Sequence, residues 1–165
     1  MAIEVHPEIV EKAEWQDEAQ TQAFAEALAA RLLRLAPAGD ALITLHGDLG
    51  AGKTTLVRYL LKALGIQGRI KSPTYAVVEP YTVASIPPLE IWHFDFYRFN
   101  DPDEWEEAGF RDIFASSGLK LVEWPDKAGQ HLPRPDLDVQ LEVSPEQVRL
   151  VTLTARSRTG QALIA

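Results

Sequence analysis

Apolar residues recur at helical spacing in two segments of the chain, and each segment predicts a helix. The first runs from about Glu14 to Leu35 and predicts an amphipathic helix that ends before the turn-forming residues 37–40. The second runs from Thr55 to Leu64 and is followed by Gly65, a residue type that commonly ends helices. The apolar face of the first helix is expected to consist of Phe24, Ala27, Leu28, Leu32 and Leu35.

Shorter segments that are continuously apolar, or that alternate between apolar and polar residues, predict strands. Because Pro80 cannot donate a ladder hydrogen bond, it favours an edge position or a break in the strand that contains it. That strand is expected to pair as a hairpin with the next one. The predicted strands are 41–45, 75–83, 89–96, 119–124, 140–143 and 149–155.

Strands and helices of this kind predict a single α/β domain over residues 1–165. The acidic residues and the proline of Asp101–Trp105 are typical of a helix start. The last third of the chain is expected to be mainly strand, because its final two strands flank the turn signal 144–147 and should pair antiparallel. Residues 1–14 are expected to be an N-terminal extension that can be poorly ordered.

Length and composition indicate the broad class of protein to which this chain belongs. The chain has 165 residues, of which 46% are hydrophobic, a size and content that suit one compact globular domain. No apolar run approaches the length of a membrane span, and Met1–Glu8 lack the pattern of a signal peptide. We therefore expect a cytoplasmic protein with no membrane association. The absence of cysteine excludes disulfides and thiolate metal sites.

The charge balance argues against direct binding of DNA or RNA. The net charge is −8, and the 16 lysine and arginine residues are scattered along the chain. Proteins that grip nucleic acid through their own surface normally carry a clustered basic patch, since phosphate contacts dominate the affinity.

A complete phosphate-binding loop lies between the strand 41–45 and the helix that begins near Thr55. Glycines let backbone N–H groups approach phosphate oxygens, and the following helix N-terminus favours negative charge. Lys53 is expected to neutralise the β- and γ-phosphates, while the Thr54 hydroxyl ligates Mg²⁺. The sequence therefore predicts binding of a nucleoside triphosphate. The expected binding residues are Gly47, Asp48, Leu49, Gly50, Ala51, Gly52, Lys53, Thr54 and Thr55.

Two carboxylates are placed where such a site needs one, at the ends of apolar strands. Asp95 is the first candidate for positioning Mg²⁺ or water, although it could instead cap a turn or pair with Arg98. Glu123 is the second, as a metal ligand through water or as a group that polarises water. Trp124 could stack on a base, but tryptophan is more often part of a core or an interface.

The polar segment Lys71–Tyr75 follows the helix of the phosphate loop. A hydroxyl of Ser72 or Thr74 could reach the γ-phosphate and Mg²⁺, as in nucleotide-dependent switches. A plain turn that leads into a strand is the alternative, and the residues alone favour it.

Together, four motifs resemble those of the bacterial TsaE family (also called YjeE), the ATPase of tRNA threonylcarbamoyladenosine biosynthesis. The similarity extends from about Glu18 to the C-terminus, and the order and spacing of the motifs make it specific. The motifs are Gly47–Thr55, Ser72–Tyr75, His93–Arg98 and Glu123–Pro125.

The resemblance assigns roles to individual residues. It implies that Asp95 is the acid essential for ATP hydrolysis and that Glu123 coordinates Mg²⁺ beside Thr54. Residues 72–74 would be the switch-like segment. Trp124 would lie beside the nucleotide, and Thr21 matches a threonine near the nucleotide in the family's N-terminal helix.

The same resemblance implies a P-loop NTPase-like three-layer domain with a mixed central sheet. It also implies the cofactors ATP and Mg²⁺ and the partners TsaD and TsaB, with contact to tRNA only through that complex. An ATPase that is weak alone and stimulated by these partners is therefore expected. A P-loop small-molecule kinase, and a nucleotide-gated interaction module that needs no hydrolysis, are the alternatives.

Overall fold

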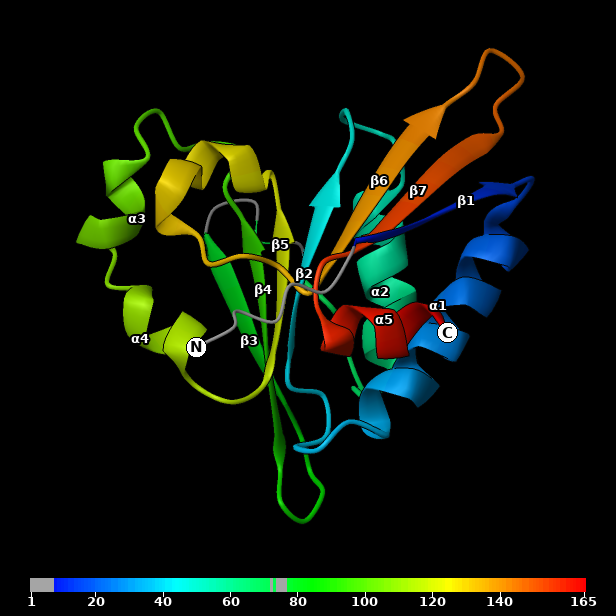
Figure 1. Ribbon diagram of the computed structural model, residues 1–165. Helices are drawn as coiled ribbons and strands as arrows, with labels where there is room; N and C mark the ends of the chain where they lie inside the picture. Colours follow the sequence, from blue (N-terminus) through cyan, green and yellow to red (C-terminus); the bar gives the residue numbers. More distant parts are fainter. Residues whose placement is uncertain (1–7, 72, 74–76) are drawn as a thin grey trace, which may run out of the picture.

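The computed structural model describes residues 8–71, 73 and 77–165, and in these residues seven strands form one sheet (Figure 1). The strand order is β1-β7-β6-β2-β5-β4-β3. No helix in the described part of the chain is long and apolar enough to span a membrane. The strands are β1 (Ile9–Trp15), β2 (Ala41–His46), β3 (Val78–Val83), β4 (Leu89–Asp95), β5 (Leu119–Glu123), β6 (Leu137–Val143) and β7 (Arg149–Ala155).

The sheet is mixed, with a parallel centre and antiparallel edges. Strands β6, β2, β5 and β4 run parallel to one another, whereas β7 and β1 on one side and β3 on the other run antiparallel to their neighbours. Parallel strands need helical crossovers and are covered on both faces. The helices are α1 (Glu18–Leu33), α2 (Lys53–Ala63), α3 (Asp103–Glu107), α4 (Arg111–Ala115), α5 (Arg158–Ile164) and the 3₁₀ helix η1 (Pro125–His131).

The helices form two layers, one on each face of the sheet (Figure 1). On the face of α1, α2 and α5, the inward side chains of β2 are Ile43 and Leu45, whereas Leu42 packs on the opposite face. This alternation follows from the two-residue period of a strand. The predicted three-layer α/β domain with a mixed central sheet is therefore confirmed.

The layer of α3, α4 and η1 packs through aromatic side chains. Phe94 stacks on Phe114 at a centroid distance of 4.7 Å, and Phe96 stacks on Phe99 at 4.8 Å. Aromatic contacts of this kind add to the free energy of apolar burial. The buried members of this cluster are Leu42, Phe94, Phe96, Phe99, Trp105, Phe110, Val122 and Ala128.

The N-terminal region differs from the prediction, because residues 9–15 form strand β1 and the helix begins only at Glu18. The Asp17 side chain fixes this start by accepting a hydrogen bond of 3.0 Å from Gln20 N–H. β1 is an edge strand in which Trp15 is the buried residue, so its side chains carry no alternating pattern. The predicted extension thus joins the sheet from residue 9 onward.

The buried face of α1 also differs from the prediction. Ala27 is exposed, and Phe24 and Leu35 are only partly buried. The small residues that face the sheet give a weak apolar pattern, which explains the error in the predicted face. The fully buried side chains are Thr21, Ala25, Leu28, Ala29 and Leu32.

The predicted pairings of the later strands are confirmed. Strands β3 and β4 form the expected antiparallel hairpin, with exposed Pro80 on the edge strand. Strands β6 and β7 form the expected final pair. The last third of the chain also contains helix α5, which the sequence analysis missed. The Ser157 side chain caps this helix by accepting from Gly160 N–H at 3.0 Å, and Leu163 is buried.

A polar cluster lies on the face of the sheet that η1 covers, and it links β2 to β6 and to Arg156, the residue after β7. The Asp138 carboxylate accepts from the hydroxyl of Thr44 and from Arg156 Nε, and it lies 3.1 Å from His46 Nε2. Burial alone would raise the pKa of Asp138, but the hydrogen bonds from His46, Thr44 and Arg156 lower it to about 2. The cluster therefore stabilises the fold most when Asp138 is ionised.

We expect Asp138→Asn to lower the free energy of unfolding at pH 7, on the order of 2 kcal/mol, because the charged acceptor is lost. The folded-state pKa is depressed, so this contribution is present above pH about 4 and is lost as the pH falls toward 2. Urea unfolding at pH 7 and at pH 2.5 measures it, with exposed Asp112→Asn as the matched control. An Asp138 effect of equal size at both pH values would contradict this account.

Candidate functional site

The phosphate loop connects the end of central strand β2 to the start of α2, and its shape depends on two glycines. Gly47 has a φ of 148°, and a Cβ there would lie 2.6 Å from the carbonyl oxygen of Leu141 on the neighbouring strand β6. Gly52 has a φ of 108°, and a Cβ there would lie 2.8 Å from Arg149 Nε. Both positions therefore require glycine for conformation and for space.

The N-terminus of α2 directs backbone donors out of the loop. The first bond of the helix runs from Leu56 N–H to the carbonyl of Gly52 at 3.0 Å. The amides of Lys53, Thr54 and Thr55 therefore lie outside the helical ladder. Such a helix start attracts anions through its free N–H groups and its dipole.

Lys53 is buried at the base of the loop. Its ammonium group donates to the carbonyl of Gly47 and lies 3.8 Å from the centroid of the Trp124 ring. Burial lowers the pKa of Lys53, while the nearby carboxylates of Glu123, Asp95 and Asp48 act in the opposite direction. The site thus holds a buried cation at the base of the loop, and this cation is what suits the position to a phosphate group.

Sheet register brings the two predicted carboxylates to the same place. Glu123 ends β5, directly between β2 and β4, and it is paired with Asp95 at the end of β4. Glu123 is buried, and its two carboxylate oxygens lie 3.2 and 3.4 Å from Thr54 Oγ1. A hydroxyl and a carboxylate in contact are a donor set that Mg²⁺ commonly uses.

Asp95 lies on the cleft side of this pair and is half-buried. Its Oδ1 accepts from Tyr97 N–H at 2.9 Å, so it also forms the turn that the sequence analysis considered as an alternative role. Burial raises the pKa of Asp95, and the Glu123 carboxylate acts in the same direction. The Tyr97 hydrogen bond and the charges of His93 and Lys53 oppose that rise.

His93 is a site residue that the sequence analysis did not select. It is almost fully buried, and its Nε2 lies 2.6 Å from Glu123 Oε2. In the described residues its Nδ1 has no hydrogen-bond partner. The available signal was its position two residues before Asp95, on the same strand face. His93 therefore holds one carboxylate oxygen of Glu123 in place.

A cleft of about 590 Å³ runs over these groups. Trp124 adopts a left-handed conformation with φ of 57°, and its ring lies 5.0 Å from that of Tyr97. Of the predicted residues, the cleft contains Leu49, Gly50, Gly52, Lys53, Thr54, Thr55, Asp95, Glu123 and Trp124. Ser72 and Thr74 lie outside the described residues, but Pro73 between them also lines the cleft.

The remaining predicted residues lie beside the main cleft. Gly47, Asp48 and Ala51 line a second cavity of about 780 Å³ on the other side of the loop. Thr21 lines a small pocket of about 70 Å³ together with residues of the loop and of α2. Arg149 lines both that pocket and the main cleft, and the sequence analysis did not select it.

A metal ion would need ligands beyond the protein's own side chains. In the described part of the chain, no group of three or more histidine, cysteine, aspartate or glutamate residues could hold a metal. Mg²⁺ is typically bound by one or two carboxylates together with water and substrate phosphates. The pair of Thr54 and Glu123 fits that mode, because the cleft leaves room for phosphate beside it.

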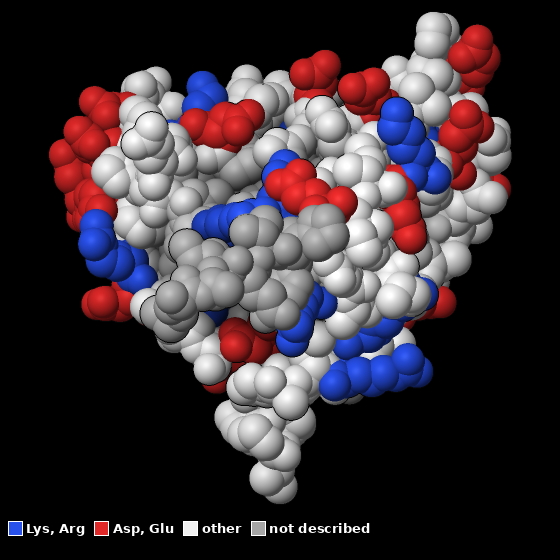
Figure 2. All heavy atoms as spheres, in the orientation of Figure 1, with Lys and Arg blue, Asp and Glu red and all other residues white. Residues whose placement is uncertain are grey.

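The charges around the cleft are mixed. On the face shown in Figure 2, lysine and arginine side chains lie in separate groups among acidic ones. This view shows no continuous basic surface over the described residues.

Known proteins of similar sequence match most of the length of this chain. Two relatives are both described as the tRNA threonylcarbamoyladenosine biosynthesis protein TsaE. The one from Haemophilus influenzae is 40% identical over 149 residues, covering 90% of this chain and 92% of the relative. The one from Bacillus subtilis is 36% identical over 136 residues, covering 82% and 80%.

Structure and family comparisons extend this likeness over nearly the whole chain. The crystal structure of Bacillus subtilis YdiB superposes with a TM-score of 0.74 and 27% sequence identity, covering 96% of this chain and 94% of that one. The model of the family described as threonylcarbamoyl adenosine biosynthesis protein TsaE matches residues 15–151. The chain belongs to the TsaE family.

Proposed function

We propose that this protein is a Mg²⁺-dependent ATPase that acts in the biosynthesis of threonylcarbamoyladenosine in tRNA. The observation that carries the proposal is the contact between Thr54 Oγ1 and the buried Glu123 carboxylate, at the base of the phosphate loop. This contact joins the helix start, which suits phosphate, to an acid that suits a metal ion. The names of the relatives supply the pathway.

In ATP hydrolysis, the side chains and backbone amides of this site have different roles. Lys53 neutralises the β- and γ-phosphate oxygens, while the amides at the start of α2 orient them. Thr54 and Glu123 would hold the metal, with Asp95 beside them. A bound Mg²⁺ would supply positive charge that favours in-line attack by water on the terminal phosphate. His93 fixes Glu123 in one orientation through its hydrogen bond.

Asp95 is the residue best placed to act on the attacking water. It faces the cleft, and burial raises its pKa, which makes its carboxylate a stronger base than an exposed aspartate. Tyr97 N–H donates to Oδ1, so Oδ2 is the oxygen that would accept a proton from water. Asp95 and Glu123 then differ in role because only Glu123 contacts Thr54.

A small-molecule kinase would need a lid whose arginine reaches over the phosphates, and the loop around Arg134 is the late segment of the chain that could supply one. In the structure, Arg134 Nη2 instead lies 3.4 Å from Glu8 Oε1. It lines a different cavity, together with Asp138 and Arg156. We therefore propose that water is the acceptor of the terminal phosphoryl group.

We further propose that TsaD and TsaB are the partners, that tRNA is reached only through them, and that the complex is cytoplasmic. The net charge of −8 supports a subunit that leaves the RNA to others. Weak activity alone fits this role, because an accessory ATPase should turn over only when the assembly is complete.

We expect Asp95→Asn and Glu123→Gln each to lower steady-state ATP hydrolysis by about 100-fold or more, because each removes a charge that acts on water or metal. ATP affinity should change much less, since Lys53 and the loop amides remain. Hydrolysis assays and calorimetric titration measure the two effects, with exposed Glu107→Gln as the control. Full turnover by a protein carrying both changes would rule out this mechanism.

We expect ATP hydrolysis to rise about tenfold or more when TsaD and TsaB are added, which corresponds to about 1.4 kcal/mol of barrier lowering. The Glu123→Gln protein should still form the complex in the presence of ATP but should not support tRNA modification. Modification assays with this variant separate an ATPase from a nucleotide-gated module. Undiminished modification without hydrolysis would favour the module.

A further inference from the structure

A separate cavity lies between α3, α4 and η1, and none of the described residues that line it lines the nucleotide cleft. Its volume is about 340 Å³. Part of its wall is aromatic, because the Trp105 ring stacks on His131 at a centroid distance of 5.7 Å and meets Phe114 at 5.6 Å. Exposed Arg111 and Ala115 of α4 also line it, so this α3 cavity opens to the surface.

The indole N–H of Trp105 has no acceptor. Trp105 is 2% exposed, and its Nε1 lacks a hydrogen-bond partner in the part of the chain that the structure describes. Buried tryptophan N–H groups usually donate to an acceptor, because an unpaired buried donor costs free energy. Trp105 lines the α3 cavity, so an occupant of the cavity can supply the acceptor. A carbonyl oxygen fits this requirement, since it accepts and does not donate.

The surface around the α3 cavity is acidic. Helix α3 has the sequence Asp-Glu-Trp-Glu-Glu, so four of its five residues are acids. Figure 2 shows acidic side chains gathered at the left edge of the molecule, where Figure 1 places α3. His131 lies 3.0 Å from Asp103 and 3.4 Å from Glu106, and Arg111 pairs with Glu106. Arg111 offsets only one of these charges, so the rim attracts lysine and arginine side chains of a partner.

A protein segment suits this cavity better than a small anion does. The acids of α3 repel anions. The volume lies near the lower end of the range for small-molecule sites, about 300 to 1,000 Å³. One apolar side chain can therefore fill the aromatic part of the cavity while the adjoining backbone lies on the rim. A backbone carbonyl next to that side chain is then close enough to accept from Trp105 Nε1.

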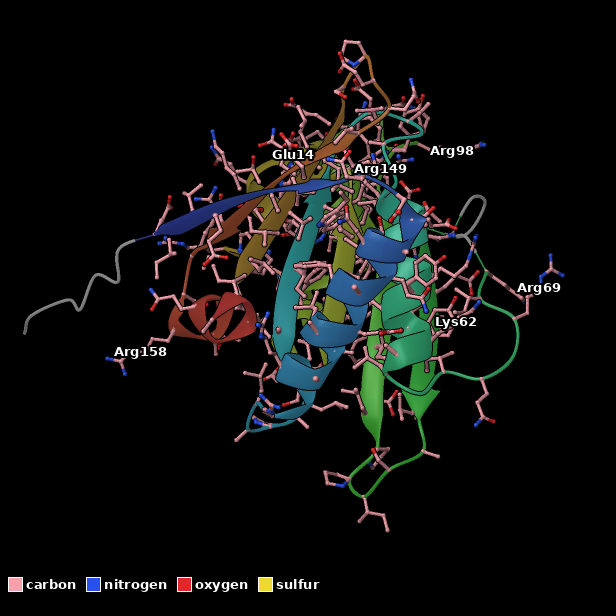
Figure 3. The ribbon with its side chains drawn as sticks, turned by 90° about the vertical axis from the view of Figure 1, so that its right-hand side faces the viewer. Glu14, Lys62, Arg69, Arg98, Arg149 and Arg158 are labelled. Carbon is pink, nitrogen blue, oxygen red and sulfur yellow. The ribbon has the colours of Figure 1, made fainter. Side chains whose placement is uncertain are left out.

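Helix α3 also bounds the nucleotide cleft. Glu104 lines that cleft together with Arg98 and Phe99, which lie on the segment between β4 and α3. Figure 3 shows Arg98 extending outward at the same end of the molecule as Arg149, whose side chain contacts the phosphate loop. Because Trp105 directly follows Glu104, a partner in the α3 cavity contacts the helix that bounds the cleft. This position suits a partner that stimulates hydrolysis.

We propose that the α3 cavity binds a segment of a protein partner that presents an apolar side chain, a free backbone carbonyl and flanking lysine or arginine residues. The apolar side chain packs on Trp105 and Phe114, the carbonyl accepts from Trp105 Nε1, and the basic side chains pair with the acids of the rim. This proposal rests on the partner-dependent function proposed above, and the TsaD–TsaB complex is the probe that tests it.

Calorimetric titration of the protein with the TsaD–TsaB complex, in Mg²⁺ and a non-hydrolysable ATP analogue, tests occupation of the cavity. Ala115→Phe places a large ring at the cavity and is expected to weaken binding about 10-fold or more. Ala27→Phe makes the same change at an exposed position of α1 and should bind as the unmodified protein does. ATP hydrolysis by isolated Ala115→Phe should be unchanged, because Ala115 does not line the nucleotide cleft.

Trp105→Phe tests the carbonyl contact, because it keeps an aromatic ring and removes the N–H. Within the described residues the change removes no intramolecular hydrogen bond. Binding of the TsaD–TsaB complex should weaken about 3- to 10-fold, the size expected for one hydrogen bond. If this variant does not fold, the indole N–H resonance of Trp105 in the unmodified protein gives the same test, since it should move downfield when the complex binds.

Asp103→Asn tests the charge of the rim. It keeps an oxygen for His131 and removes one negative charge, so binding at low salt should weaken about two- to fivefold. The loss should disappear at about 1 M salt, where the screening length is about 3 Å. Glu14→Gln removes an exposed acid on the edge strand β1 and should have no effect (Figure 3).

Three results would contradict the proposal and leave the proposed function standing. Unweakened binding by Ala115→Phe overturns occupation of the cavity. Self-association in sedimentation that is lost in Ala115→Phe assigns the cavity to a second copy of the chain instead. Unchanged binding by Trp105→Phe, or an indole resonance that does not move, overturns the carbonyl contact.

Two further results have wider consequences. Equal or tighter binding by Asp103→Asn at low salt overturns the basic character of the partner segment. An unmodified protein that hydrolyses ATP but does not bind the TsaD–TsaB complex overturns this proposal together with the proposed partners, while the ATPase activity stands.

Discussion

The parallel pairing of β2, β5 and β4 is the constraint on which the site depends. Neighbouring strands lie about 4.8 Å apart, so residues at equivalent positions on three strands span only about 10 Å. Leu45, Glu123 and Asp95 occupy such equivalent positions. The loop that follows Leu45 and the two carboxylates must therefore meet at one edge. A strand order that inserted other strands between these three would separate these groups, whatever their identities.

Burial of charge is the cost of this arrangement, and local pairing offsets it. Lys53, His93 and Glu123 are each at least 95% buried, a state that ionisable groups adopt only when they have partners. His93 supplies one partner for Glu123, and Thr54 supplies another. The apolar layers on both faces of the sheet hold these strands rigidly, which keeps the paired groups in register.

The sequence predicted the features that depend on neighbouring residues or on a clear pattern of apolar and polar positions. The phosphate loop could be located because strand, glycines and helix are contiguous, and the hairpins could be located because their alternation is clear. Strand β1 was missed, since an exposed edge strand is held by backbone pairing with β7 and not by a buried face. His93 and Arg149 were missed as site residues because their partners lie far away in the chain.

The contacts of Lys53 show how the loop keeps its shape. The ammonium is held by one backbone carbonyl of the loop, that of Gly47, and by the face of Trp124. Both are weaker partners than a doubly charged phosphate, because neither carries a full negative charge. They offset part of the cost of burial without competing strongly for the cation. Trp124 can do this because its left-handed backbone turns the ring back over the loop directly after Glu123. Trp124 therefore follows directly after Glu123, the last residue of β5, and also covers the lysine, which couples these two parts of the site through a single peptide unit.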